Sequence, residues 1–297
     1  MTNASALPVV RTVAALRETV AGWRAAGQSV GFAPTMGALH EGHLSLIDAA
    51  RGAADRCVAS VFVNPTQFGP NEDFAAYPRT EDADAKLLAG RGCDLLYAPS
   101  ADEMYPAGFA TEISVSGVTE ILCGASRPGH FDGVATVVAK LFNQVQPDLA
   151  VFGEKDFQQL QVIRRLVADL DLPVRILSAP TVREADGLAM SSRNRRLTPA
   201  QREVAARLNR VLKATAEALA AGEPAKPVLN AGADVLKEAG FDGVDYLEAR
   251  MEDGLAPLQE GAGGQKARVL AAVRLNHDDG GDVRLIDNWP FTRPQAR

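Results

Sequence analysis

Two histidines stand three residues apart in the stretch APTMGALHEGHLSLIDAA, residues 33–50. A zinc protease motif places its histidines four residues apart on one continuous helix, whereas His40 and His43 enclose Gly42 at a shorter spacing. A third metal ligand would have to come from His130 or from an acid elsewhere, and the pattern does not support one. The spacing therefore argues against a metal site.

The glycines around the pair favour phosphate chemistry. Gly37 and Gly42 are typical of a strand-to-helix turn at which the backbone approaches a ligand closely, with the helix expected to begin near His43. A preorganised donor aimed at transition-state charge contributes about 3 to 4 kcal/mol. The stretch is therefore predicted to bind phosphate through its backbone while the histidines take part in catalysis. The alternative is that the two histidines are solvated residues at a helix start. The flanking glycines and the later motifs argue against this alternative.

Further candidates lie in loops along the chain. Lys155 and Asp156 in FGEKDFQQL suit phosphate binding and helix capping, but the residues alone are better explained as an ordinary surface turn. Gln67 in NPTQFG sits on a proline-containing turn and is open to the same explanation. Arginine-rich loops such as the MSSRN segment are more often solvated surface, but its two serines and its position at the domain junction favour a functional role. Arg127 and His130 in RPGHFDGV are candidates for the site or its surroundings.

The elements that must position these residues alternate along the first two thirds of the chain. Short apolar runs predict strands at 29–35, 56–66, 93–100, 148–153 and 173–182, and amphipathic runs predict helices at 12–27, 43–54, 80–92, 133–145 and 156–170. This alternation indicates βαβ units on a parallel sheet. Ligands bind beyond the carboxyl ends of such strands, so the loops after Ala33, Val63 and Phe152 are expected to converge on one crevice.

The pattern changes after about residue 182. One long amphipathic helix is predicted over 198–222, with Thr198 as N-cap, Pro199 at N1 and Gln201 completing a capping box. A helix at 226–240 and strands at 244–250, 267–275 and 283–288 then indicate a small antiparallel sheet. We expect two domains, at residues 1–182 and 183–297.

Composition limits the classes of partner. The 297 residues are 46% hydrophobic and carry a formal charge of −6, which gives no basic excess for nucleic acid binding. The chain shows no apolar stretch approaching the roughly 20 residues of a membrane span and no signal-peptide pattern. Cys57, Cys93 and Cys123 are odd in number and widely spaced, so neither a disulfide framework nor a zinc knuckle is expected. A reducing cytoplasm fits best, without nucleic acid or membrane as a partner.

Five strings in order carry a family resemblance: PTMGALHEGHLSL, FVNPTQFGPNEDFAAYPRT, RPGHFDGVATVV, FGEKDFQQL and MSSRN, spanning residues 34–194. The H-x-G-H turn after a strand looks like the signature of the HxGH nucleotidyltransferase superfamily, which includes class I aminoacyl-tRNA synthetases. The whole set resembles the pantothenate synthetase (pantoate–β-alanine ligase) family. The C-terminal segment is similar more loosely, through VDYLEA and RLIDN.

This resemblance implies a fold and an activity. The fold is an α/β Rossmann-like doubly wound parallel sheet that binds ATP and pantoate, with a smaller C-terminal α+β domain closing over the site. The activity is the ATP- and Mg²⁺-dependent condensation of (R)-pantoate with β-alanine to (R)-pantothenate, AMP and diphosphate through a pantoyl-adenylate. The mixed anhydride supplies the carboxylate with a better leaving group, and holding both partners together supplies proximity. The family also implies a homodimer in the cytoplasm.

The resemblance also implies residue roles. His40, as proton donor, His43 and Lys155 are the catalytic residues, and Gln67 is assigned to pantoate and β-alanine, with Gln159 assigned to pantoate. The residues implied in ATP binding are Met36, Gly37, Ala38, Leu39, His40, Glu41, Gly42, His43, Gly153, Glu154, Lys155, Asp156, Val182, Met190, Ser191, Ser192 and Arg193. Val137 and Val138 are candidates to line the pantoate pocket, which core packing explains equally well. The family tends to carry acids for Mg²⁺ in YPRTEDADAKL, where Asp82 and Asp84 are the candidates and Ala83 interrupts the run.

Two competing functions remain to be weighed. Another HxGH nucleotidyltransferase is the nearest, either an adenylyltransferase acting on a phosphate or an aminoacyl-tRNA synthetase. A synthetase needs a surface for tRNA, and this chain is short and acidic. The other competitor is a protein that binds a nucleotide without turning it over. The intact histidine pair, Lys155 and Gln67 argue against it, because binding alone does not require groups that stabilise a transition state.

Overall fold

The computed structural model describes residues 7–70, 72–258, 264–277 and 281–293. The chain forms two compact units, of which the first holds the residues up to Glu154 together with Val162–Pro180. The second unit holds Lys155–Gln161 and the residues from Thr181 onward. The expected domain boundary at 182 lies near this change of unit, but the Lys155–Gln161 segment groups with the second unit. The closure of one domain over the other stays a prediction.

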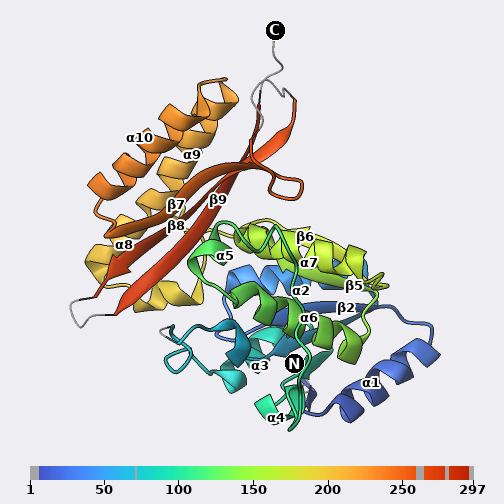
Figure 1. The fold of residues 1–297 in the computed structure, drawn as a ribbon. Coiled ribbons are helices and arrows are strands. Elements are labelled where there is room, and N and C mark those ends of the chain that lie inside the picture. The colour runs from blue at the N-terminus through green and yellow to red at the C-terminus, as the bar shows by residue number, and fades with distance from the viewer. Residues whose placement is uncertain (1–6, 71, 259–263, 278–280, 294–297) are drawn as a thin grey trace. The chain divides into compact units, whose positions relative to one another are not determined.

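A six-stranded parallel sheet forms the centre of the first unit (Figure 1). Its strands are β1 (Val9–Val10), β2 (Val30–Thr35), β3 (Arg56–Val61), β4 (Leu95–Tyr97), β5 (Leu149–Gly153) and β6 (Arg175–Ala179), in the order β1-β4-β3-β2-β5-β6. The chain proceeds outward from β2 through β3 to β4, and in the opposite direction from β5 to β6. The carboxyl ends of β2 and β5 are therefore the switch point at which such sheets bind ligands. The predicted α/β class with a doubly wound parallel sheet is confirmed.

Helices cover this sheet on both sides (Figure 1). They are α1 (Val13–Ala25), α2 (Glu41–Ala53), α3 (Glu81–Gly90), α4 (Ala101–Met104), α5 (Cys123–Ser126), α6 (His130–Val145) and α7 (Phe157–Asp169), with 3₁₀ turns η1 (Pro65–Gln67) and η2 (Glu154–Asp156). α2 packs on β2, β3 and β5, and its Ile47 is fully buried in a core that includes Ala33, Ala59 and Val151. This buried face fixes the helix whose first turn carries the histidines.

The second unit is a three-stranded antiparallel sheet packed against helices (Figure 1). Its elements are η3 (Ser192–Arg196), α8 (Pro199–Ala205), α9 (Arg207–Ala220), α10 (Ala225–Glu238), β7 (Gly243–Met251), β8 (Lys266–Asn276) and β9 (Asp282–Thr292). The predicted small antiparallel sheet and the Thr198–Gln201 capping box are both present. The single helix expected over 198–222 is wrong, because the chain divides at Ala206 into α8 and α9.

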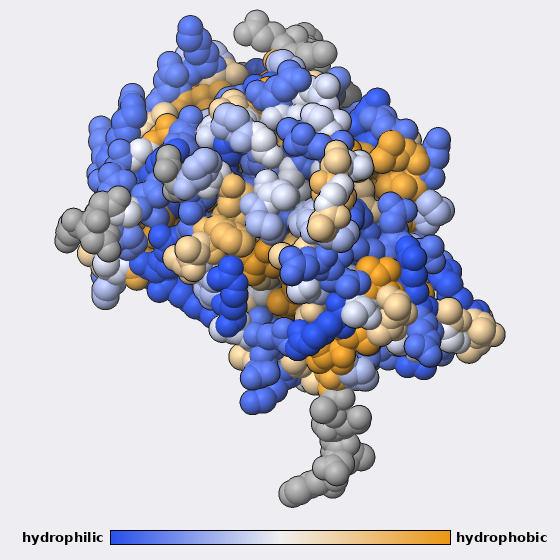
Figure 2. Space-filling model, turned by 60° about the horizontal axis from the view of Figure 1, so that its bottom comes forward, coloured by the Kyte–Doolittle hydropathy of each residue, from blue (hydrophilic) through white to orange (hydrophobic). Residues whose placement is uncertain are grey.

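Hydrophilic side chains cover most of the face drawn in Figure 2, with hydrophobic ones showing between them. Among the described residues, the exposed large hydrophobic ones are Val9, Leu87, Phe109, Leu170 and Val235, which come from five different elements or loops. Single exposed hydrophobic residues of this kind are ordinary on a protein surface. In the part of the chain that the structure describes, no helix is both long and apolar enough to span a membrane.

Candidate functional site

The turn between β2 and α2 has an unusual backbone. Gly37 adopts φ +83° and Ala38 adopts φ 51°, both in the left-handed region. A Cβ at Gly37 would meet Asp84 Oδ2 and Val61 Cγ1 at 3.0 Å, so both the conformation and the close packing require glycine. Ala38 has no such freedom, and the left-handed conformation costs a residue with a Cβ roughly 1–2 kcal/mol. The structure around the turn must therefore hold it in place.

Asp84 is the residue that holds it. Its carboxylate is 1% exposed, and it accepts hydrogen bonds from Ala38 N at 2.9 Å and Leu39 N at 2.8 Å. The hydroxyl of Thr80 donates to the same carboxylate at 3.1 Å. At the other end of the turn, Thr35 Oγ1 accepts from Gly37 N at 3.2 Å and donates to the Ser60 carbonyl at 2.7 Å. Four residues outside or at the edge of the turn thus fix its backbone.

His40 is the N-cap of α2, and this helix begins at Glu41 rather than near His43 as expected. The reason is local: His40 Nδ1 accepts a hydrogen bond from Gly42 N at 3.1 Å, which satisfies one of the unpaired amides of the first turn. Because Nδ1 accepts, the proton of the neutral ring is assigned to Nε2, so that Nε2 is a donor.

The two histidine rings lie together. Their centroids are 4.1 Å apart, and the planes are inclined by 36°. His43 N also donates to the His40 carbonyl at 2.8 Å, within the first turn of α2. Both rings therefore stand at the carboxyl end of β2, beside the first amides of a helix, where phosphate is favourably bound.

Gln67 lies beside this turn, within a cluster of amides. Its Nε2 is 3.2 Å from the sulfur of Met36, and its Oε1 accepts from Asn64 Nδ2 at 3.0 Å. Asn64 is in turn held by Tyr105, whose hydroxyl donates to Asn64 Oδ1 at 2.8 Å. The structure thus brings Met36 and Gln67 together, as expected of one site. Asn64 and Tyr105 were missed by sequence reasoning, although Asn64 follows a buried strand, stands directly before Pro65 and is itself 1% exposed.

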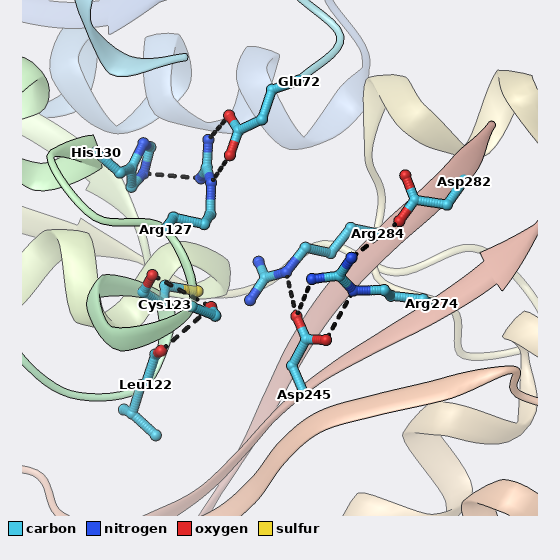
Figure 3. A network of polar contacts seen from close by, with 10 residues as sticks. Glu72, Leu122, Cys123, Arg127, His130, Asp245, Arg274, Asp282 and Arg284 are labelled. Carbon is cyan, nitrogen blue, oxygen red and sulfur yellow. Dashed lines mark hydrogen bonds and ion pairs between the residues drawn. The ribbon is translucent and has the colours of Figure 1, made fainter. Parts of the chain in front are cut away.

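Arg127 and His130 connect the Gln67 segment to α6, and Figure 3 shows Arg127 between His130 and Glu72. His130 Nδ1 lies 2.9 Å from the Gln67 carbonyl, which can only accept, so Nδ1 is the donor. His130 Nε2 then accepts from Arg127 at 2.9 Å. Arg127 also forms a bidentate pair with Glu72, at 2.7 and 2.5 Å. Burial by itself raises the pKa of Glu72, but the hydrogen bonds and charge of Arg127 hold that pKa below its ordinary value.

Val137 and Val138 are both 5% exposed on α6, where Gly133 allows a close approach. A Cβ at Gly133 would lie 2.5 Å from the Thr66 carbonyl, so α6 packs directly against η1. The burial of the two valines agrees with core packing and with a pocket lining alike.

The second unit holds the segment of Lys155 and Asp156. Lys155 Nζ lies 3.5 Å from Asp156 Oδ2, and the Lys155 carbonyl accepts from Asn288 Nδ2 at 3.0 Å. Asn288 is buried, and its Oδ1 accepts from Arg268. This lysine segment is thus tied to β9 and is no loose surface turn. Gln159 is half-buried in the first turn of α7.

The loop over 182–193 is also built into the second unit. The Val182 carbonyl accepts from Met190 N at 3.0 Å, and Ser191 Oγ accepts from Arg193 N at 3.2 Å as the cap of η3. Ser192 is only 8% exposed, so this residue is not part of a solvated surface loop. Of the remaining expected ATP-binding residues, Gly153 ends β5 and Glu154 begins η2, where its carboxylate accepts from Ser178 Oγ at 3.1 Å.

Two ion-pair networks brace this second unit. Arg183 donates to both oxygens of Asp287, at 2.7 and 3.0 Å, and burial raises the pKa of Asp287 above its ordinary value in spite of that arginine. On the sheet, Asp245 accepts from Arg274 and Arg284, each at 2.7 Å, which links the three strands (Figure 3). Burial raises the pKa of Asp245, and the two arginines lower it below its usual value. These networks support the sheet.

Asp82 and Asp84 do not fit the expected magnesium site. Asp82 is exposed on α3, whereas both oxygens of Asp84 are engaged by the amides of the Ala38 turn. Across the described ranges, no group of three or more histidine, cysteine, aspartate or glutamate residues is placed to hold a metal ion. This donor arrangement gives no support to Mg²⁺ coordination by the pair.

Comparison with known proteins gives one family. The family model described as Pantoate-beta-alanine ligase matches residues 8–290. The pantothenate synthetase of Paramagnetospirillum magneticum is 58% identical to this chain over 284 residues, which cover 96% of this chain and 98% of that protein. The pantothenate synthetase of Chelativorans sp. is 56% identical and covers 97% of this chain and 99% of its own length.

Solved structures agree with these sequence matches. The crystal structure of pantothenate synthetase from Thermus thermophilus has a TM-score of 0.86 and 48% identity, over 95% of this chain and 99% of that chain. The ligase from Francisella tularensis, solved in complex with "Beta-gamma ATP" and β-alanine, has a TM-score of 0.79 and 34% identity, over 96% and 97% of the two chains.

Proposed function

The chain belongs to the pantoate–β-alanine ligase family, and we propose that it works through a pantoyl-adenylate formed at the turn of His40 and His43. It is an ATP-dependent ligase that joins the carboxylate of pantoate to the amine of β-alanine. A carboxylate does not react with an amine directly because oxide is a poor leaving group. Its attack on the α-phosphorus of ATP releases diphosphate and leaves AMP as a good leaving group for the second step.

The histidine turn is suited to the first step. Charge develops on the departing diphosphate, and the His40 tautomer that leaves a proton on Nε2 provides a donor for it. His43, with its ring 4.1 Å from that of His40, provides a second imidazole in the same place. The amides of the first turn of α2 are suited to the remaining phosphate oxygens. This paired arrangement beside a helix start is the observation that carries the proposal.

The amide cluster is suited to the acid and the amine. Gln67 and Asn64 offer neutral donors and acceptors, which match a hydroxy acid without adding a full charge. Tyr105 holds Asn64, so the cluster is organised before any ligand arrives. We propose that Gln67 binds pantoate and β-alanine, and that Gln159 binds pantoate.

For ATP itself, we propose the residues from Met36 to His43 in the first unit, together with Gly153, Glu154, Lys155, Asp156, Val182, Met190, Ser191, Ser192 and Arg193. Support comes from the two segments of the second unit, which are held by Asn288 and by their own capping contacts and so present backbone and side chains from fixed positions. Lys155 in this scheme balances phosphate charge in the transition state.

Mg²⁺ is proposed only as a companion of the nucleotide. Since Asp82 and Asp84 do not fit a magnesium site, phosphate oxygens and water remain as its ligands. No step is derived through the ion. A cytoplasmic location is also proposed from the family, and the three buried thiols, which form no disulfide, agree with a reducing compartment.

The proposal is tested by ATP–diphosphate exchange with and without pantoate. We expect labelled diphosphate to enter ATP only when pantoate is present, because the adenylate must form before the reverse reaction can occur. AMP should then accumulate only after β-alanine is added. Exchange that ignores pantoate would contradict the pantoyl-adenylate, and AMP release without β-alanine would contradict the assignment of the second step.

A further inference from the structure

The strongest unassigned feature is the relation between Asp84 and the histidine turn. Asp84 lies in the first turn of α3, more than forty residues after the turn in the sequence, and is 1% exposed. Its Oδ2 accepts from Ala38 N and from the hydroxyl of Thr80, and its Oδ1 accepts from Leu39 N. The carboxylate therefore faces two successive backbone amides immediately before His40.

These two amides belong to buried residues and need an acceptor. Gly37 and Ala38 adopt left-handed conformations, and the residues Ala38 and Leu39 are buried. Buried amides without an acceptor are strongly disfavoured, and a carboxylate forms shorter and stronger hydrogen bonds than a neutral acceptor. Gly37 completes the fit, since any Cβ there would meet Asp84 Oδ2 at 3.0 Å.

We infer that Asp84 is a positioning residue for adenylation, which fixes the backbone of Ala38 and Leu39 and thereby the place of the His40 ring. This inference rests on the proposed role of His40. Asp84 does not reach the substrates in this scheme; it acts through the turn. This role differs from the magnesium assignment, because both oxygens of Asp84 already accept hydrogen bonds from the backbone of the turn.

Thr80 takes part in the same hydrogen-bond network as Asp84. It stands at the N-cap position of α3, yet its side chain makes no capping hydrogen bond. Its hydroxyl instead donates to Asp84 Oδ2. Thr80 thus orients the carboxylate, and its removal should weaken the turn without removing the acceptor itself.

The test uses three variants of the full chain. Asp84→Asn keeps the size of the side chain but replaces one acceptor oxygen by an NH₂ group that faces a backbone N–H. Thr80→Val removes only the orienting hydroxyl and is the second variant in case Asp84→Asn does not fold. Asp82→Asn is the matched control, because it removes the same charge from the exposed face of the same helix.

Rates are measured for the two half-reactions separately. We expect Asp84→Asn to lower pantoate-dependent ATP–diphosphate exchange by about 10²-fold, as a misplaced catalytic group does. The rate of AMP release from chemically supplied pantoyl-adenylate with β-alanine should fall by a factor at least ten times smaller than that for exchange. The reason is that this step has no diphosphate to stabilise. Thr80→Val should show the same pattern at smaller amplitude, and Asp82→Asn should match the wild type. An equal fall in both half-reactions would reduce Asp84 to a general structural role and overturn the inference.

Two further readouts separate positioning from metal binding. Hydrogen exchange of the Ala38 and Leu39 amides should become faster in Asp84→Asn while β5 and α6 are unchanged, and this measurement needs no activity. The Mg²⁺ concentration for half-maximal exchange should stay the same. Unchanged protection of the two amides, or a rise in the half-activating Mg²⁺ concentration that excess Mg²⁺ reverses, would overturn the inference. If ATP–diphosphate exchange by the wild type does not depend on pantoate, while hydrogen exchange of the two amides becomes faster in Asp84→Asn, the proposed function fails. The contact between Asp84 and the turn is then still supported.

Discussion

His40 combines a structural and a chemical role that can be separated experimentally. Its Nδ1 caps α2 through Gly42 N, and the same hydrogen bond leaves the proton on Nε2. A loss of activity in His40→Ala alone would therefore be ambiguous, because removing an N-cap typically costs about 1 kcal/mol. Asparagine is a strong N-cap whose amide can accept from Gly42 N but does not extend to the position of Nε2.

We expect both His40→Ala and His40→Asn to lower turnover by about 10² to 10³-fold while ATP still binds, because both lack the donor on Nε2. The melting temperature should fall for His40→Ala and stay near that of the wild type for His40→Asn. Steady-state kinetics, nucleotide titration and thermal unfolding measure the three quantities. Near-normal turnover of the capped variant would remove the His40 imidazole from the mechanism.

At the scale of elements, the site depends on how segments are joined. α2 is held by Ile47 in the core of the sheet, and the turn before α2 is held by Asp84 of α3. The segment after η1 is joined to the start of α6 by the Arg127 network, in which Glu72 is the anion. Each of these contacts brings together residues that are distant in sequence. Substitutions far from the reacting groups should therefore alter the geometry of the site.

The Glu72–Arg127 join predicts a dependence of stability on pH. The pKa of folded Glu72 lies below its ordinary value of 4.5, so the pair stabilises the fold fully above that pH and this contribution is lost as the pH falls through the folded pKa. Glu72→Gln should thus be less stable than the wild type at about pH 7, by about 1 to 2 kcal/mol. The difference should shrink at about pH 4 and below.

Urea unfolding of both proteins across this pH range measures the difference. Glu18→Gln, which removes the charge of an exposed glutamate on α1, is the control and should follow the wild type at every pH. A stability difference that stays constant as the pH is lowered would show that the charge of Glu72 is not what joins the two segments.

At the scale of the whole molecule, the chain has two units with separate cores. The core of the first includes Ile47, Leu96 and Val151, and that of the second includes Leu212 and Val269. The residues proposed for ATP are divided between these units, since the histidine turn belongs to the first and Lys155 to the second. The family further implies a homodimer.

For the assembly, we expect light scattering behind size exclusion to give twice the mass of the chain, and the mass to stay constant over a wide range of protein concentration. Dilution to the concentrations used in kinetic assays should leave specific activity unchanged, as for a stable assembly. A monomer mass at concentrations where the enzyme is fully active would contradict the homodimer.

The sequence by itself determined the alternation of strands and helices, the parallel sheet and the family. These features rest on local periodicity and on short motifs such as H-x-G-H, which the chain carries wherever it folds. It also proposed His40, His43 and Gln67 as candidates, and the structure has His40 and His43 at the start of α2 and Gln67 in η1. The start of α2 was two residues off, because the cap is made by a histidine side chain rather than by one of the usual capping residues.

Only the tertiary structure decided what Asp84, Asn64 and Tyr105 do. An aspartate in the first turn of a helix is consistent with a metal ligand, a cap or a solvated charge, and spacing cannot separate these. The choice depends on which backbone amides α3 meets when it packs beside α2 and the turn after β2, and that is a contact between segments distant in sequence. The stabilisation of the left-handed turn before His40 therefore depends on tertiary packing, whereas the histidines themselves can be recognised from the sequence.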